Sequence, residues 1–323
     1  MGISLIARAI RMMAVYIFGA SGDTIIEKGG HLNMGVPGIM FFGALGGILG
    51  EIAYANNVPV GTALNPFLII FVPLLMAMLF GAIGGLLYCF LTVTLKCNQN
   101  VVGLALTTFG LGLSKFFIAK LTGIPGSRVS EAGLMLQHLF TNYKSAGAFG
   151  ELFLEGSFFT YFSIILAIAI SLFIAKTKIG LNLRAVGENP ASADAAGINV
   201  TKYKYLSTMI GSAIVGIGGM VYVLDVQMGA YSATNQVDAY GWLCLSIVIL
   251  SAWRSWITIP VSLGIGILAM IPIAISLPTP YAKLLNAVPY IATIIVLIIT
   301  SVIGSKKMQP PAGLGKTYFR EDR

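Results

Sequence analysis

Long apolar runs separated by short polar segments are the feature that most constrains this chain. About 20 apolar residues coiled as an α-helix span the roughly 30 Å hydrocarbon core of a bilayer. We therefore expect membrane-spanning helices near residues 3–20, 36–55, 66–95, 100–121, 157–175, 206–224, 240–253, 257–277 and 285–304.

The composition argues against a soluble domain. Only 10% of the residues are charged and 57% are hydrophobic, whereas roughly 25% of a typical soluble domain is charged. The 38 glycines suit close contacts between helices in a bilayer. We predict an all-α polytopic membrane protein with about 9–10 transmembrane helices, some of them broken or re-entrant.

The positions of Lys and Arg predict the orientation, because cytoplasmic connections carry an excess of them. Segments 176–205 and 305–323 are rich in these residues, so we expect a cytoplasmic loop and a cytoplasmic C-terminal tail. The connection 122–156 has more acids than bases and is expected outside. The transmembrane domain then covers 1–304.

The first span is ambiguous in orientation. Nine simple spans with a cytoplasmic C-terminus place the N-terminus outside, whereas Arg8 and Arg11 favour the inside. A broken or re-entrant segment near 21–45 would restore an even number of crossings. Residues 18–20 fit a signal-peptidase site poorly, so we interpret this run as a retained span.

Two segments look breakable, "GDTIIEKGGHLNMGVPGIMFFGALGG" near the start and "NQVDAYGWLCLSIVILSAW" in the second half. Non-helical backbone at membrane depth is tolerated only where protein or a water-filled cavity satisfies it. Paired interrupted segments in two halves of a transporter indicate a substrate path. Two ordinary helices with Gly for packing remain the alternative.

Catalytic motifs are absent from the sequence: it has no Walker A pattern, G-x-S-x-G elbow or H-E-x-x-H pair. We interpret His31 and His138 as surface or loop residues and Cys89 and Cys244 as core residues. Almost every acid lies in a loop or at the end of a run, so no proton relay is indicated. We therefore expect no enzyme, and an external energy source for any pumping.

The polar stretch "NLRAVGENPASADAAGINVTKYK" interrupts the apolar pattern at 182–204. Asn189 suits an N-cap, Pro190 the first helical position, and Gly197 a C-terminal stop. We expect a helix over 190–196. Two turns are too short to be stable alone in water, so this helix must dock on its own membrane helices or on a partner.

From Gly180 to Ile198 the chain fits the pattern G-x-x-x-R-A-x-G-x-N-P-x-x-A-x-x-x-G-I. This segment resembles the cytoplasmic signature of permease subunits of bacterial ABC importers, in the branched-chain amino acid and ribose permease superfamily. The chain is most similar to simple-sugar and nucleoside permeases that work with basic-membrane-protein lipoproteins. "GGHLNMGVPGIMFFGA" is similar to a second family segment but has Pro37 where an acid is usual.

The resemblance implies a multi-pass permease subunit in the bacterial cytoplasmic membrane, importing nucleosides or related simple sugars by alternating access. It implies three partners: an ATPase with two nucleotide sites, a lipoprotein that delivers the substrate, and a second permease, which we expect to be a paralogue. ATP and Mg²⁺ would be bound by the ATPase, and no cofactor by this chain. The expected ATPase-coupling residues are Arg184, Gly187, Glu188, Asn189, Pro190, Ala193, Asp194 and Gly197.

For the substrate path we expect one aromatic or apolar face and a few hydrogen-bonding groups. The residues that offer them are Asn33, Met34, Thr107, Thr108, Phe109 and Trp242. Ordinary helix packing is the alternative, since Thr also bonds to its own backbone. At the level of function, the alternatives are an ion-coupled secondary transporter of a small polar solute and an integral membrane enzyme.

Overall fold

The computed structural model describes residues 2–59, 61–121, 128–137, 157–230, 237–274, 287–303 and 309–319, and no strand occurs among them. The elements are α1 (Gly2–Lys28), α2 (Val36–Ala55), α3 (Pro66–Cys89), η1 (Phe90–Thr94), α4 (Gln99–Leu121), α5 (Val129–Gln137), α7 (Phe158–Lys176), α8 (Lys178–Glu188), α9 (Pro190–Ala195), α10 (Val200–Val221), η4 (Tyr222–Val226), α11 (Val237–Leu250), α12 (Ser255–Ala274) and α14 (Val288–Ile303). The π-helical turns η1 and η4 continue α3 and α10.

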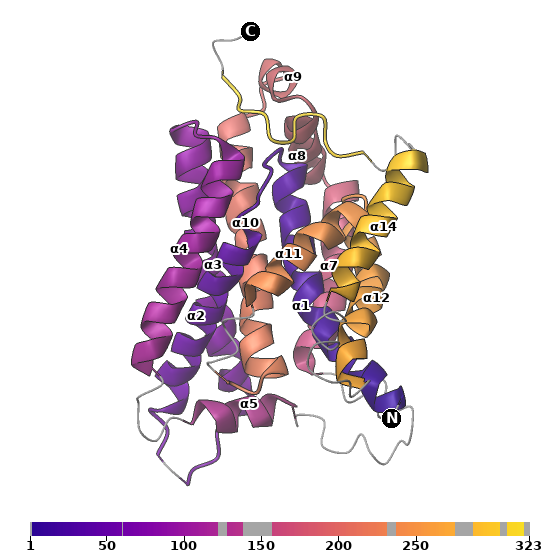
Figure 1. Cartoon of the computed structure of the whole chain (residues 1–323). Coiled ribbons are helices and arrows are strands. Elements are labelled where there is room, and N and C mark those ends of the chain that lie inside the picture. Colours follow the sequence, from indigo (N-terminus) through magenta and orange to yellow (C-terminus); the bar gives the residue numbers. More distant parts are fainter. Residues whose placement is uncertain are drawn as a thin grey trace.

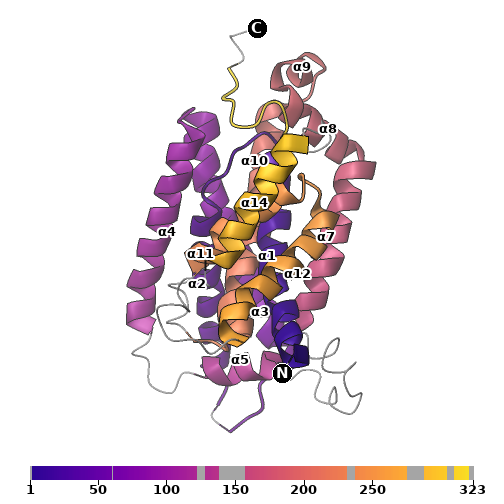
Figure 2. The same cartoon turned by 45° about the vertical axis from the view of Figure 1, so that its right-hand side comes forward.

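The helices form one upright bundle with central and peripheral members (Figure 1). The apolar windows of α2 and α10 are 83% buried, whereas those of α3, α4 and α7 are 28–33% buried. Figure 2 shows α4 and α7 on opposite flanks. Glycines bring the central helices together: a Cβ on Gly43 would fall under 3.0 Å from the backbone of Gly216, closer than real Cβ atoms approach. The peripheral helices expose apolar side chains suited to lipid.

Six described helices are long and apolar enough to cross a membrane, and α11 and α12 are shorter apolar helices. The predicted spans from 36–55 onward correspond to helices, so the all-α polytopic prediction is confirmed. The largest displacement is at α10, predicted to begin at 206 and observed to begin at 200. The predicted ends at 275–277 and 285–286 lie outside the described residues.

The first predicted span, 3–20, is wrong at its end, because α1 continues without interruption to Lys28. The additional turns contain Ser21, Asp23, Thr24 and Glu27, all buried. These polar residues end the apolar run, so hydropathy predicts that the span stops before them. In the bundle they face protein rather than lipid, and a polar residue there stays helical if its neighbours satisfy it.

The bundle has two distinct ends (Figure 1, Figure 2). The α9 end carries α8, α9, the last turn of α1 and the C-terminal segment. The α5 end carries α5 and the N-terminus. Because α1 begins at the α5 end and segment 309–319 lies at the α9 end, the expected even number of crossings is wrong. The predicted break near 21–45 is observed, because the backbone is non-helical at 29–35 between α1 and α2.

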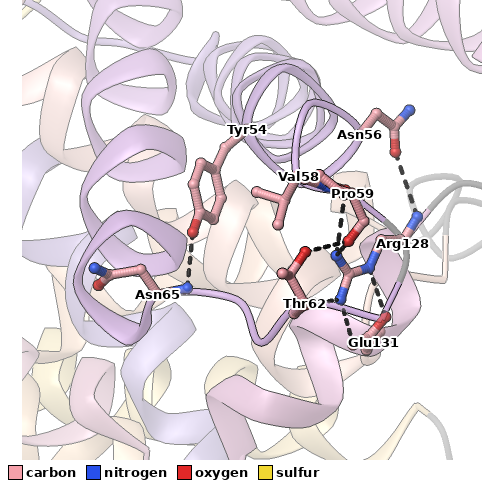
Figure 3. A network of polar contacts seen from close by, with 8 residues as sticks. All are labelled: Tyr54, Asn56, Val58, Pro59, Thr62, Asn65, Arg128 and Glu131. Atoms are coloured by element: carbon pink, nitrogen blue, oxygen red, sulfur yellow. Dashed lines mark hydrogen bonds and ion pairs between the residues drawn. The ribbon is translucent and has the colours of Figure 1, made fainter.

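Arg128 fastens α5 to the loop between α2 and α3 (Figure 3). Its guanidinium donates to the carbonyls of Val58, Pro59 and Thr62 at 3.3, 3.1 and 2.8 Å. It also donates twice to Glu131, at 2.8 and 2.7 Å. This is the only ion pair among the described residues. The rest of the predicted outer loop, including His138, lies outside the described residues, as do 305–308 and 320–323 of the predicted tail.

Candidate functional site

The polar stretch folds as two short helices, α8 and α9, that meet at Asn189. The Asn189 side chain accepts from the backbone N–H of Ser192 at 3.1 Å and so caps α9, which begins with Pro190. Gly197 ends the helix with φ of 82°, a left-handed conformation that favours glycine. The predicted helix over 190–196 is confirmed as 190–195.

The short helix docks through one face only. Ala193 is 3% exposed and packs with Val186 and Val200, against Tyr203 and Tyr318. The opposite face of α9 is exposed and made of small residues: Ala191, Ser192 and Ala195.

The residues predicted to couple to an ATPase therefore lie in unlike environments. Glu188, Asn189 and Gly197 are exposed; Arg184, Pro190 and Asp194 are partly buried; Gly187 and Ala193 are buried. Sequence reasoning missed the outward-facing set Ala191, Ser192 and Ala195, because the side on which a two-turn helix docks depends on its neighbours. The run of small residues was the available signal.

The C-terminal segment 309–319 crosses this element as a strap (Figure 1). The N–H of Ala312 donates to Glu188 at 3.0 Å, and the Tyr318 hydroxyl donates to Asp194 at 2.9 Å. Both carboxylates were predicted to face a partner protein. Each also has an intramolecular contact, which the sequence did not indicate because the strap is 124 positions away.

Backbone meets backbone where the strap, α8 and the end of α1 converge. Gly313 N–H donates to the Gly187 carbonyl at 2.9 Å, and Gly315 N–H donates to the Gly30 carbonyl at 3.2 Å. A Cβ on Gly187 would fall under 3.0 Å from the carbonyl oxygen of Lys28, and one on Gly313 would do so with Gly187. We call Gly30, Gly187, Gly313 and Gly315 the glycine joint.

The joint leads directly into residues 31–35, which run down into the bundle as non-helical backbone (Figure 1). His31 Nδ1 lies 2.8 Å from the Thr208 hydroxyl, and the residue is 1% exposed. It is a loop residue, as predicted, but it is buried and not on the surface. Leu32 is held on both sides: its N–H donates to Gln99, and Tyr88 donates to its carbonyl, each at 2.8 Å.

Of the predicted substrate-path residues, the structure brings three together. Asn33 is fully buried and accepts from Gly35 N–H at 3.0 Å. The Thr107 hydroxyl donates to the Met34 carbonyl at 3.3 Å. The two breakable segments also meet, because a Cβ on Gly241 would fall under 3.0 Å from Pro37.

The other predicted path residues are less well placed. Thr108 is exposed and bonds back to the Leu104 carbonyl at 3.1 Å, as the packing alternative expected. Phe109 is 53% exposed, with its ring 5.9 Å from that of Phe42. Trp242 is 36% exposed on α11, next to Gly241.

Acidic residues do lie inside the helices, contrary to the sequence interpretation. Asp23, Glu27, Glu51 and Asp225 are each buried. Glu27 accepts from the Trp253 indole N–H. Asp225 accepts from Ser157 at 2.6 Å and interacts electrostatically with Arg11. The sequence argument for an external energy source relied on helices without buried acids, and these four residues remove that argument.

Two cavities lie at the α9 end. One, of about 750 Å³, lies between η1, the start of α10 and the strap, and includes Asp194 and Tyr318 in its lining. The other, of about 340 Å³, lies between α7, α8 and the corner before α12. The described residues contain no group of His, Cys, Asp and Glu suited to a metal ion.

Comparison with known proteins gives a consistent assignment. The family described as "Branched-chain amino acid transport system / permease component" matches residues 5–301. The guanosine ABC transporter permease NupQ of Bacillus subtilis is 29% identical, over 96% of this chain and 94% of NupQ. The nucleoside ABC transporter permease NupC of Lactococcus lactis is 28% identical, over 91% and 90%. TsgC13 of Haloferax volcanii, assigned by name as a glucose ABC transporter permease, is 27% identical over 98% of each chain. No solved structure matches.

Proposed function

The chain belongs to the family of permease components of branched-chain amino acid transport systems, and from that premise we propose that it is the membrane subunit of an ATP-driven importer of nucleosides or related simple sugars. The supporting observation is similarity over nine-tenths or more of the chain to permeases named for guanosine, nucleosides and glucose. The family is a transport component and not an enzyme family.

We place the α9 end in the cytoplasm. Lys176, Lys178 and Lys202 are exposed there, and positive residues are retained on the cytoplasmic side. The C-terminal strap lies at the same end and is therefore cytoplasmic too. The N-terminus is then extracytoplasmic, despite Arg8 and Arg11. The electrostatic attraction between Arg11 and Asp225 offsets part of its charge inside the bundle.

The outward face of α9 is the proposed ATPase contact. Ala191, Ser192 and Ala195 form a smooth surface that another protein approaches closely. The partner is an ATPase with two nucleotide sites. A second permease and a substrate-delivering lipoprotein complete the importer. Glu188 and Asp194 hold the strap and so fix the position of this face.

The glycine joint is the proposed route by which movement of α9 reaches the substrate path. Gly187 at the end of α8 touches Lys28 and Gly30 directly. Residues 31–35 continue from there to Asn33 and Met34. Packed backbone shifts as a body rather than deforming. A displacement of α8 and α9 is therefore delivered to the non-helical segment beside Thr107.

The coupling contact is tested by two substitutions on the outward face of α9. Ala191→Trp and Ala195→Trp should abolish uptake and permease-stimulated ATP hydrolysis, because a bulky side chain separates the surfaces. The chain should still insert and melt normally, since neither side chain is buried. Undiminished uptake in both variants would contradict the proposed surface.

The cargo is tested by uptake of radiolabelled nucleosides and sugars into cells that express the permease with its ATPase and lipoprotein. Thr107→Val keeps the volume and removes the hydroxyl that holds the Met34 carbonyl. We expect an altered apparent KM if residues 33–35 line the path. Thr108→Val is the matched control, because its hydroxyl bonds only within α4. Equal kinetics in both variants would remove Thr107 from the path.

The buried acids keep an ion-coupled secondary transporter as a second candidate. Carboxylates inside a membrane bundle often mark ion or proton routes. Proteoliposomes that contain this chain alone, under an imposed proton or sodium gradient, distinguish the two. We expect no accumulation without the ATPase and ATP, and gradient-driven uptake would overturn the ATP-driven proposal.

A further inference from the structure

The smaller cavity at the α9 end has an unusual lining. Three cations border its 340 Å³: Lys28 at the end of α1, Arg184 on α8 and Arg254 at the corner before α12. Trp253 and Trp256 form part of the same wall. The cavity shares no residue with the exposed face of α9 or with residues 31–35.

The three cations are not neutralised by ion pairs within the described residues, where the only pair is the one that Arg128 makes. Two acids, Glu188 and Glu27, lie near Lys28, and each also accepts a hydrogen bond, Glu188 from the strap and Glu27 from Trp253. Their attraction offsets part of the repulsion between Lys28 and its cationic neighbours Arg184 and Arg254. An anion in the cavity would relieve that repulsion.

Two lining groups also lack a hydrogen-bond partner. The Arg184 Nε–H and the Ser255 hydroxyl are buried and bond to nothing among the described residues. Buried donors are nearly always satisfied in folded proteins. Phosphate oxygens accept from both guanidinium and hydroxyl donors, and so match this lining.

Exposed apolar side chains surround the cavity. Trp256 is 52% exposed beside it, and Leu172 and Phe173 are exposed on α7, next to the lining residues Ile174 and Ala175. Trp is enriched at the level of lipid headgroups. These apolar side chains offer nothing to free phosphate, whereas the acyl chain of a lipid would pack along them. They therefore favour a lipid headgroup as the ligand.

We propose that this cavity binds the phosphate headgroup of an anionic phospholipid, with its acyl chains along α7. Basic pockets between membrane helices are suited to such headgroups, and a volume of about 340 Å³ is at the small end of ligand pockets. The assignment to the cytoplasmic leaflet rests on the orientation proposed above. The binding site itself does not depend on the transported substrate.

Tryptophan quenching tests the proposal, because two of the three tryptophans in the chain line the cavity. The full-length chain is placed in nanodiscs of phosphatidylcholine doped with acyl-brominated phosphatidylglycerol or with acyl-brominated phosphatidylcholine. We expect stronger quenching by the anionic lipid at equal content. Arg254→Gln should lower that preference about five-fold, the effect of one cation near an anionic surface.

Lys178→Gln is the matched control, since Lys178 is an exposed cation at the same end that does not line the cavity. It should keep the wild-type preference. Equal quenching by the two lipids in the wild type would overturn the proposal. So would an equal loss of preference in both variants, which would indicate diffuse surface charge.

Inorganic phosphate distinguishes the two sources of the ligand. Millimolar phosphate at constant ionic strength should leave the lipid preference unchanged. If phosphate abolishes it, the cavity is a site for free phosphate and the lipid assignment is wrong. Melting curves of each variant in phosphatidylcholine alone verify that the folded chain is being compared.

Discussion

The two ends of the bundle are held together in opposite ways. At the α9 end, glycines put the backbones of α1, α8 and the strap in direct contact, with no side chain between them. At the α5 end, the long side chain of Arg128 reaches across to a loop and to Glu131 (Figure 3). Contact between backbones leaves no rotamer freedom, whereas a guanidinium adapts to small shifts.

The difference suggests different duties for the two ends. A joint without rotamer freedom transmits a displacement, because packed backbone moves as a body. A side-chain clamp closes a loop and tolerates movement around it. We therefore expect substitutions at the α9 end to affect transport, and those at the α5 end to affect stability.

The largest effect is expected from Gly187→Ala. The added Cβ collides with the Lys28 carbonyl, and neither partner is a side chain that can rotate away. Uptake should fall to that of cells without the permease. Gly112→Ala is the control, because a Cβ there meets nothing within 4 Å. Normal uptake by the Gly187 variant would remove the joint from the coupling route.

The second-largest effect is expected from Trp253→Phe. It removes the indole that donates to buried Glu27 and leaves a carboxylate without that partner, at a cost of about 1–3 kcal/mol in unfolding free energy. Thermal melting in detergent measures the loss. Glu27→Gln keeps an acceptor at the same place and should melt closer to the wild type. The same melting temperature for wild type and Trp253→Phe would contradict this account of Glu27.

Arg128→Met tests the other side of the comparison. It removes the donors to three carbonyls and to Glu131, so the α5 end should become more sensitive to protease. The uptake rate should stay near that of the wild type. A transport defect without a loss of stability would contradict the division of duties.

The same clamp should respond to acid. Hydrogen bonds from Arg128 hold the pKa of Glu131 below its ordinary 4.5. A depressed carboxyl pKa stabilises the folded state above 4.5, and the contribution is lost as the pH falls through the folded-state value. Protease resistance of the α5 end should therefore decline in that acid range. Glu131→Gln should lack this step.

Tyr318→Phe should have the smallest effect. It removes one hydrogen bond from the strap to Asp194, worth about 1 kcal/mol. The backbone bonds of Gly313 and Gly315 remain. Hydrogen exchange should be faster in the strap and unchanged in α8. Complete release of the strap would show that its side chain, and not the glycine joint, holds it.

The local features of the site were predictable from the sequence. Asn189, Pro190 and Gly197 define a short helix through capping chemistry that acts over a few residues. The spans were predictable from hydropathy because an apolar run is also a property of consecutive residues. The face of α9 that docks was not predictable, because Ala191 and Ala193 are the same residue type and only their neighbours distinguish them.

The sequence by itself determined the helical spans, the capped short helix and the family. Each depends on residues that are consecutive in the sequence, because the length of an apolar run and helix capping are local properties. Only the tertiary structure decided that Asp23 and Glu27 belong inside a helix, that the strap bonds to Glu188, and that three cations distant in sequence share one cavity. The free energy of a buried polar group depends on its partners, and those partners come from other parts of the chain.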